Sequence, residues 1–393
     1  MQPQLLPFEL KRSEKPTPAA RPPRRRRPFV LLAIILGSIV LLHLIAFTHT
    51  ADPSKPIRNC LDIVRYNNYS QFAIATQQNE KIGNVQLVDQ LIPGQTTVVV
   101  PIVPSVDAGT PEQLLDLYVY SCAVSDNHPE IALQFKQQHL VNATFTVTQA
   151  HTLDVSELDP LQSTDTNTST PFQRMVNREY TWNNGAFVQT SFPGLYPVTS
   201  RVEAQDLQTQ SNQGRPFQWL DPLITTSQMA KDLLHWNAGT FSAKLLTQST
   251  KEAHVLLTQR TQHFTVQVTL QRLIQPDENG LWFVTQAQSS HMSIDTFPLQ
   301  SPISSPTTIQ GTMMPTPGHN TITMFDHMLS PLPTQVSPTF ALQSHRNYTG
   351  SVFYTNTIPN QPGLLLIERI PKGSDLSAQQ AAGQLLLTSV LLD

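Results

Sequence analysis

An almost unbroken apolar segment, residues 29–47, constrains this chain more than any other feature of its sequence. At about 1.5 Å of rise per residue, a helix over this segment would extend roughly 28 Å, close to the roughly 30 Å hydrocarbon thickness of a bilayer. A cleaved signal peptide is the alternative, but its apolar region is about 7–15 residues long and ends in a small-residue cleavage site, which this segment lacks. The sequence therefore predicts a transmembrane helix over residues 28–47.

Charge on the two sides of this segment predicts an orientation. Residues 1–27 hold eight of the 25 Lys and Arg residues and two of the 28 Asp and Glu residues, and they are rich in proline. Because positively charged flanks stay inside, we expect a disordered cytoplasmic tail over 1–27 and extracytoplasmic domains after the helix. The expected localisation is the cell membrane, with a single pass and a cytoplasmic N-terminus.

The remainder of the chain is acidic, which bears on its partners. It holds 17 basic and 26 acidic residues, a net charge of minus nine, without a dense stripe of Lys or Arg. A nucleic-acid-binding surface must neutralise phosphates with basic side chains, so nucleic acid is excluded as a partner. The arginine run 24–27 is interpreted as the orientation signal of the predicted helix and a contact with anionic lipid.

Length and pattern after the apolar segment predict more than one domain, because about 345 residues exceed one usual hydrophobic core. The first, 57–195, is expected to be a mixed α+β domain with strands at 96–100, 115–124 and 142–148 and a short amphipathic helix at 131–140. The aromatic patch 179–187 contains Asn184-Gly185, a pair that favours a tight hairpin turn. Its aromatic residues indicate core packing, with a sugar-binding platform as the alternative.

Both cysteines, Cys60 and Cys122, fall in this first domain. A disulfide between them would close a loop of about 60 residues and add roughly 4 kcal/mol by the chain-entropy estimate. Two buried thiols are the alternative, because spacing alone does not place two Cα atoms within bonding range.

The middle region, 200–292, combines helices and long antiparallel strands. Helical patterns cover 202–213 and 225–236, strict alternation covers 264–271, and Gly280-Leu281-Trp282-Phe283-Val284 begins a final strand. Together with Trp236, this arrangement resembles the cone-shaped nuclear-transport-factor-like fold found in many exported bacterial proteins. Enzymes of that family use an Asp/His or similar pair inside the cone. Three histidines are available for such a role, but they show no diagnostic spacing: His235, His254 and His263.

The last region, 293–393, is rich in proline, and its pattern is one of short strands separated by turns. Ser305-Pro306 with Ile309-x-Gly311, a strand ending at Asp326 and the run Gly363-Leu364-Leu365-Leu366-Ile367 resemble the immunoglobulin-like domain of bacterial spore-germination and cell-surface proteins. The fold class expected for the whole chain is therefore α+β multidomain: a transmembrane helix, a mixed α+β domain, a cone-like α+β domain and an immunoglobulin-like β-sandwich.

Motifs that carry chemistry are absent from the sequence. It contains no nucleophile elbow, metalloprotease helix, P-loop, dinucleotide fingerprint, CxxC pair or EF-hand loop. His128 and Glu130 are interpreted as a solvated turn, and four glycosylation sequons are attributed to composition: Asn68, Asn142, Asn167 and Asn347. We therefore assign no catalytic, cofactor-binding or metal-binding residue and expect no cofactor.

Two classes of function remain open after this survey. The first is a membrane-anchored, non-catalytic binding or scaffold protein of the cell envelope, with the membrane and a cell-wall component or another surface protein as partners. The second is a tethered enzyme that uses a pocket in the cone-like region. The missing acid/base or nucleophile set favours the first.

Overall fold

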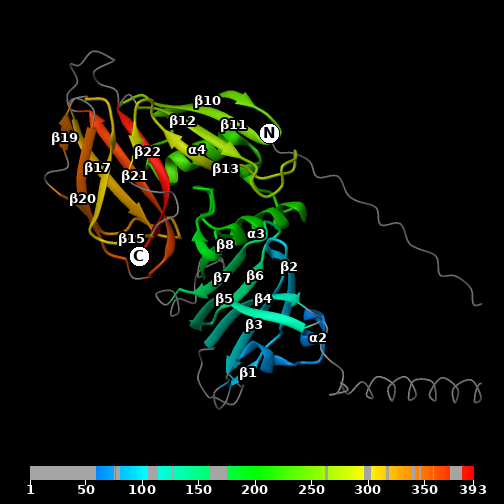
Figure 1. The fold of residues 1–393 in the computed structure, drawn as a ribbon. Coiled ribbons are helices and arrows are strands. Elements are labelled where there is room, and N and C mark those ends of the chain that lie inside the picture. The colour runs from blue at the N-terminus through cyan, green and yellow to red at the C-terminus, as the bar shows by residue number, and fades with distance from the viewer. Residues whose placement is uncertain are drawn as a thin grey trace, which may run out of the picture. The chain divides into compact units, whose positions relative to one another are not determined.

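In the computed structural model, every residue described below lies in one compact unit, Ile57–Asp393 (Figure 1). The structure describes residues 59–74, 76, 80–104, 114–125, 128–159, 175–261, 264–295, 302–315, 318–337, 341–344, 347–356, 358–371 and 383–393.

The predicted α+β class is wrong, because the described residues are mostly β-sheet. Their α-helices are α2 (Cys60–Arg65), α3 (Arg201–Asn212) and α4 (Pro222–Asp232). The predicted membrane localisation is corrected as well: none of the helices in the described ranges is long and apolar enough to cross a bilayer. Residues 28–47, on which that prediction was based, lie outside the described residues, as does the tail 1–27.

The N-terminal part of this unit begins with an antiparallel sheet whose two faces are both covered. Side chains alternate along its strands, so that Val99, Leu117 and Val119 point to one face and Val98 and Tyr120 to the other. The second face packs against α2 and the 3-10 helix η1 (Tyr69–Phe72). The strands are β1 (Glu80–Ile82), β2 (Gln86–Ile92), β3 (Gln95–Pro104), β4 (Leu114–Ser125) and β5 (His128–Val141), in the order β1-β3-β4-β5 with β2 also paired to β3.

The helix predicted at 131–140 is instead most of strand β5. Ile131, Leu133 and Phe135 alternate with less apolar residues, which is the period of a strand. Their strand pairs with β4 from Leu114 opposite Val141 to Ser125 opposite His128, with two register shifts along the way. Pairing with a long neighbouring strand thus overrides the helix preference of the Gln and Lys residues in this segment.

A second sheet packs against the first and completes a β-sandwich. Its inner residues Leu153, Val155 and Tyr180 share a core with Val99 and Leu117 of the first sheet. The predicted hairpin turn is confirmed, since Asn184 and Gly185 both have positive φ and join two paired strands. The strands, in spatial order, are β6 (Thr144–Val147), β7 (Leu153–Leu158), β8 (Met175–Asn183) and β9 (Ala186–Thr190).

The third sheet runs through both the middle and the last regions of the chain. Its strands β13 and β22 lie on opposite sides of the domain limit expected at 292/293, yet they pair at Ala287 and Leu387. The described order is β10-β11-β12-β13-β22-β21-β17, with β15 beside β22. The bounds are β10 (Phe241–Gln248), β11 (Glu252–Gln259), β12 (Phe264–Gln271), β13 (Phe283–Gln288), β15 (Pro302–Ile303), β17 (Gly318–Phe325), β21 (Gln361–Pro371) and β22 (Gln384–Leu392).

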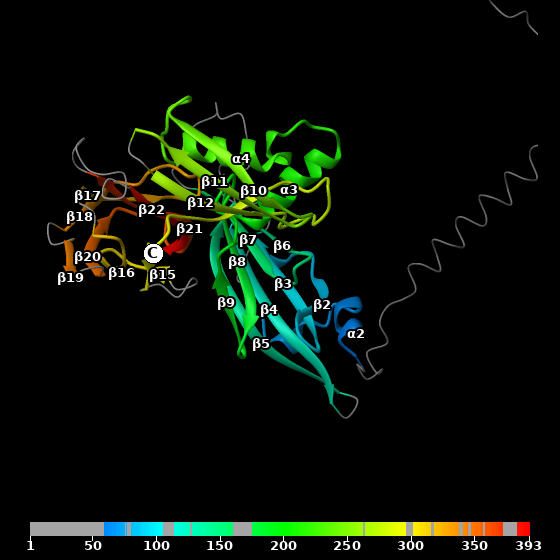
Figure 2. The ribbon, with the colours of Figure 1, turned by 90° about the horizontal axis from the view of Figure 1, so that it is seen from above.

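Two layers cover this third sheet. Helix α4 contacts β10 and β11 (Figure 2). Asp221 caps its N-terminus: the Asp221 carboxylate accepts a hydrogen bond from the Leu223 backbone N–H at 2.7 Å. The other layer is a fourth sheet that packs against β17, β21 and β22. Strand β21 is therefore buried on both faces, which accounts for its continuous apolar run. The fourth sheet comprises β14 (Ser293–Ile294), β16 (Thr307–Thr312), β18 (Thr334–Val336), β19 (Ala341–Ser344) and β20 (Asn347–Tyr354).

Candidate functional site

An open groove of about 480 Å³ lies on the outer face of the first sheet, beside the short helices that cover it. One wall comes from η1 and the two residues after it, and the other from strands β4 and β5. We call this feature the aromatic groove. Its lining residues are Gln71, Phe72, Ala73, Ile74, Tyr118, Tyr120, Ile131, Leu133 and Lys136.

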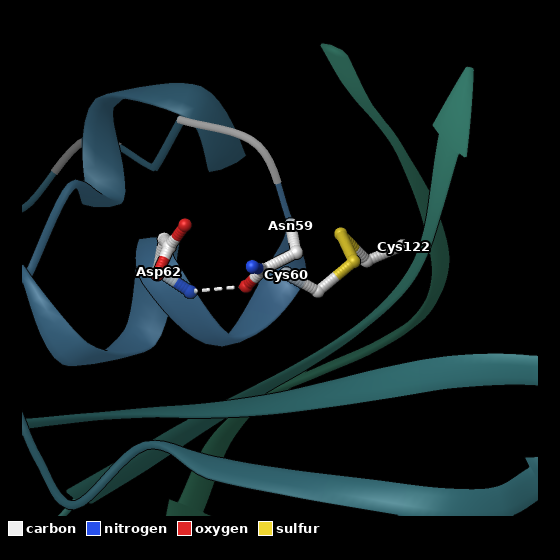
Figure 3. Close-up of a disulfide and its surroundings, with 4 residues drawn as sticks. All are labelled: Asn59, Cys60, Asp62 and Cys122. Carbon is white, nitrogen blue, oxygen red and sulfur yellow. Dashed lines mark hydrogen bonds between the residues drawn. A yellow bond between two sulfur atoms is a disulfide. The ribbon is translucent and has the colours of Figure 1, made fainter. Parts of the chain in front are cut away.

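Strand alternation and a disulfide build this groove. Tyr118, Tyr120 and Cys122 follow one another at every second position of β4, so all three point to the outer face. Cys122 is bonded to Cys60, with their Cα atoms 5.9 Å apart (Figure 3), which confirms the bridge favoured by the sequence. The Asn59 side chain accepts a hydrogen bond from the Asp62 backbone N–H at 2.8 Å and so caps the N-terminus of α2. The disulfide thus fastens α2, the helix that precedes η1, to the sheet.

Packed aromatic rings support the groove, and polar and apolar atoms share its surface. The Phe72 and Tyr120 ring centroids are 5.0 Å apart, and the Tyr118 ring lies nearly parallel to that of Tyr120, with centroids 6.4 Å apart. Burial raises the pKa of Tyr120 to about 12, and burial followed by the charge of Asp116 raises the pKa of Tyr118, so both hydroxyls are protonated and can donate hydrogen bonds at neutral pH. Leu133 is 50% exposed, a large apolar side chain open to solvent.

Lys136 supplies the positive charge of the groove. Its Nζ atom lies 5.5 Å from the centroid of the Tyr118 ring, within range of a cation–π contact. It is also the only charged side chain among the described residues that line the groove. The arrangement therefore offers a surface of mixed polar and apolar character beside a single cation.

The histidines considered for the cone-like region are not brought together. Trp236, Phe264, Val266 and Trp282 are buried in one core, where they fill the space between α4 and the third sheet. His254 Nε2 lies 2.8 Å from Glu252 Oε1, but both side chains are substantially exposed on β11. His235 lines a separate pocket of about 340 Å³ that also includes Glu368, and His263 lies outside the described residues.

The aromatic patch 179–187 takes part in packing. Tyr180 is buried in the sandwich core, and its hydroxyl accepts a hydrogen bond from Gln137 Nε2 at 3.1 Å. The Trp182 and Phe187 rings meet edge to face across the hairpin, with centroids 5.2 Å apart. These contacts match the core-packing interpretation better than the sugar platform.

The remaining residues singled out in the sequence lie apart from the groove lining. His128 and Glu130 are exposed at the start of β5, next to the β4–β5 connection. Asn68 precedes η1, Asn142 follows β5 and Asn347 begins β20, whereas Asn167 and the polar stretch 162–170 lie outside the described residues.

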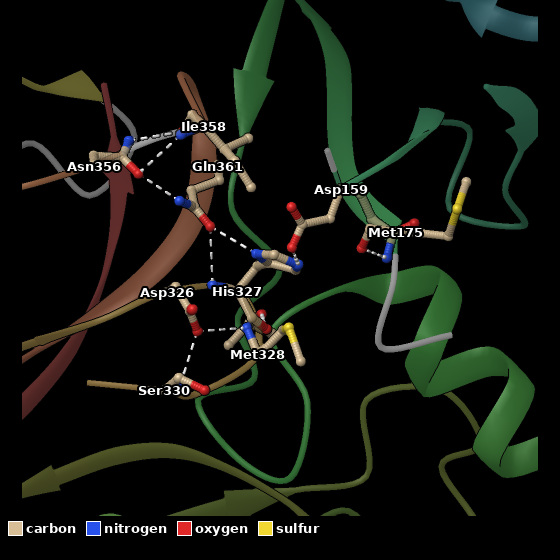
Figure 4. A network of polar contacts seen from close by, with 11 residues as sticks. Asp159, Met175, Asp326, His327, Met328, Ser330, Asn356, Ile358 and Gln361 are labelled. Atoms are coloured by element: carbon tan, nitrogen blue, oxygen red, sulfur yellow. Dashed lines mark hydrogen bonds and ion pairs between the residues drawn. The ribbon is translucent and has the colours of Figure 1, made fainter. Parts of the chain in front are cut away.

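The sequence patterns did not predict one buried polar network, which is centred on His327. Figure 4 shows His327 between Gln361 and Asp159: Nδ1 lies 2.6 Å from Gln361 Oε1, and Nε2 lies 3.9 Å from Asp159 Oδ2. The second distance is too long for a hydrogen bond but within reach of an ion pair. Thr199 also donates a hydrogen bond to the His327 carbonyl at 3.0 Å. This network joins the loop after β17 to the end of β7, a connection that local spacing does not reveal.

Comparison with known proteins adds little to this site. No family model matches the chain, and no curated protein matches it. One solved structure, titled as a GH43 β-1,3-galactosidase, aligns with 76% of this chain and 66% of its own length, at 9% sequence identity and a TM-score of 0.18. A score this low carries no argument about fold or activity.

Proposed function

We propose that this protein is a non-catalytic binding module that holds an extended peptide segment of another protein in the aromatic groove. The observation that carries the proposal is the groove itself: about 480 Å³ of open volume between η1 and strands β4 and β5. Ligand sites in proteins are concave, mostly apolar and about 300–1,000 Å³ in volume. The disulfide fastens α2, which contacts the η1 wall, to β4; this restraint limits the freedom of the wall and lowers the entropic cost of binding.

The chemistry of the lining favours a peptide over a sugar. Tyr118, Ile131 and Leu133, which are half-buried or exposed, can contact a large apolar anchor side chain, and aromatic anchors often dominate the binding energy of protein interfaces. The exposed lining is polar and apolar in nearly equal parts, which suits a peptide segment with both apolar side chains and backbone amide groups. Lys136 adds a preference for a carboxylate next to the anchor. The expected ligand is therefore a segment with a large apolar residue and a nearby Asp or Glu.

The alternative of an enzyme has less support from the described residues. The pair His254 and Glu252 is exposed on a strand, and His327 and Asp159 are buried away from the aromatic groove. General acid–base catalysis needs its titratable groups within hydrogen-bond reach of a bound substrate. Neither pair lines the aromatic groove or the pocket beside His235, so no observation favours a second function.

A library of random peptides displayed on phage, panned against the immobilised full chain, tests the proposal. Peptides that combine an apolar anchor with an acidic residue should be enriched, and Tyr118→Ala should weaken their Kd at least tenfold. Leu246→Ala is the matched control, because Leu246 is an exposed apolar residue on β10, outside the groove lining. The proposal is wrong if no peptide is enriched, or if the enriched peptides bind the Tyr118→Ala protein as tightly as the unchanged chain.

A further inference from the structure

A group of buried carboxyl groups lies on the face of the second sheet that points away from the sandwich core. Asp154 of β7 and Glu179 of β8 are direct cross-strand partners, so their side chains share this face. Asp154 is only 1% exposed and Glu179 only 5%. Glu203, in the first turn of α3, belongs to the same group. We call Asp154, Glu179 and Glu203 the carboxyl cluster.

Hydrogen bonds satisfy part of this cluster. Arg201 Nε donates to Glu179 Oε1 at 2.6 Å, and Ser200 Oγ donates to Glu203 Oε2 at 2.7 Å. Ser156 Oγ lies 3.3 Å from Asp154 Oδ1. The second oxygens of the two most buried members, Asp154 Oδ2 and Glu179 Oε2, have no hydrogen-bond partner. Two buried polar atoms without partners are costly in a native structure and call for an explanation.

A small cavity adjoins these two residues. Its volume of about 10 Å³ is room for about one water molecule, which excludes a substrate-sized ligand. Asp154 and Glu179 line it together with Arg201, and the opposite side is formed by Pro362 of β21 and Leu391 of β22. The cluster therefore lies where the N-terminal sandwich meets the strands of the third sheet.

Other contacts hold the same junction. Gln189 Nε2 donates to the Asn360 carbonyl at 2.7 Å, and Arg178 Nη2 donates to the Pro359 carbonyl at 3.1 Å. Neither hydrogen bond requires a group that titrates near neutral pH. The residues of β21 and β22 that line the cavity carry no charge. Three other charged groups lie on the packed elements outside the cavity lining: Asp206 of α3 and Glu368 and Arg369 of β21. The rest are Glu157, which pairs with Arg178, and Asp159, Asp326 and His327 of the neighbouring network.

The charges of the carboxyl cluster do not balance when all of its members are ionised. With all three carboxyl groups ionised, one guanidinium, that of Arg201, would face three negative charges in a buried setting. Buried charges of one sign repel strongly because water does not screen them. We propose that the carboxyl cluster is a proton-binding site that keeps β7, β8 and the start of α3 packed against β21 and β22 while it is protonated, and loosens this junction when its protons are lost.

The surroundings of Asp154 and Glu203 raise the pKa of both groups, which sets the pH range in which the junction should loosen. Burial, reinforced by the charge of Glu179, raises the pKa of Asp154 to about 8, and burial raises the pKa of Glu203 to about 7. Both groups hold their protons below these values in the folded protein and lose them above. The junction should therefore be tight at pH 6 and looser at pH 9.

Hydrogen–deuterium exchange of the full chain tests this proposal, with rates corrected for the intrinsic effect of pH. Protection of the amides in β8 and β21 should fall at least tenfold between pH 6 and pH 9. Amides in β12, which β13 and β22 separate from β21 in the third sheet, should keep their protection, so that loosening of the junction is told apart from global unfolding. Asp154→Asn, which keeps the shape without the charge, should remove most of the fall.

Two further variants complete the experiment. Glu203→Gln should remove a smaller part of the fall, and it replaces Asp154→Asn as the test if that variant does not fold. Glu130→Gln, at an exposed carboxylate of β5, should behave like the unchanged protein. Protection in β8 and β21 that is equal at both pH values, or a fall that persists undiminished in the cluster variants, overturns the proposal. The proposal does not depend on peptide binding, so the two stand or fall separately.

Discussion

Tyr118 and Lys136 are direct cross-strand partners on β4 and β5, and the lysine Nζ lies 5.5 Å from the tyrosine ring centroid. This pair combines the two properties that the proposed ligand must match. The ring continues the apolar surface formed by Tyr120 and Phe72, and the ammonium group provides the charge. Reversing that charge changes the specificity of the groove and leaves its shape largely intact.

Lys136→Glu should therefore weaken binding of an acidic peptide selected on the unchanged protein by about three- to tenfold, because an exposed ion pair contributes about 0.2–1 kcal/mol and reversal adds repulsion. The same peptide with its Asp or Glu changed to Lys should prefer the variant. Fluorescence anisotropy with both peptides at low and high salt measures the two effects. Identical preferences in the two proteins would show that Lys136 does not read ligand charge.

Removing the disulfide should destabilise the N-terminal sandwich. Replacing Cys60 and Cys122 together by serine opens a loop of 62 residues, for which the chain-entropy model gives a loss of about 4 kcal/mol. Urea unfolding of the double variant measures this loss. Reduction of the unchanged protein should produce a similar loss, which controls for the serine substitutions, and a difference under about 1 kcal/mol would contradict the prediction.

Stability should depend on pH in a direction set by the carboxyl cluster. The pKa of Asp154 is raised from 3.8 to about 8, so between these values the folded state binds a proton that the unfolded state releases. The free energy of unfolding therefore falls as pH rises through this window, by about 2–3 kcal/mol between pH 6 and pH 9. Urea unfolding at both pH values measures it, and Asp154→Asn should flatten the dependence. Equal stability of the unchanged protein at pH 6 and pH 9 would refute the assignment.

The core beneath α4 should be sensitive to a single truncation. Trp282 is fully buried, and the guanidinium carbon of Arg272 lies 4.4 Å from its ring centroid. Trp282→Ala should cost about 3–5 kcal/mol, because it removes a large buried side chain and leaves a cavity. Thermal or urea unfolding measures the loss against Phe353→Ala, whose side chain is 47% exposed and should matter little. A loss as small as that of the control would show that this core collapses around the gap.

Local patterns in the sequence were informative where neighbours along the chain decide the structure. Alternation at 264–271 predicts strand β12, and Asn184-Gly185 predicts the turn between β8 and β9. Ser200 caps α3 and Glu203 lies three residues later, the spacing of a capping box. The bounds of α3, Arg201–Asn212, are close to the helical pattern predicted at 202–213. The same kind of reasoning failed at 131–140, where pairing with β4, and not local propensity, determines the backbone.

The sequence by itself determined strands with clear alternation, such as β12, and the turn at Asn184-Gly185, because hydrophobic periodicity and turn chemistry act over a few residues. Only the tertiary structure decided which strands pair and which side chains meet. The pairing of β13 with β22, the meeting of Phe72 with Tyr120 and the placing of Asp154 opposite Glu179 all join residues distant in the chain. Such contacts depend on the packing of whole sheets against each other. The aromatic groove and the carboxyl cluster are therefore products of tertiary packing, built from side chains that no local pattern distinguishes.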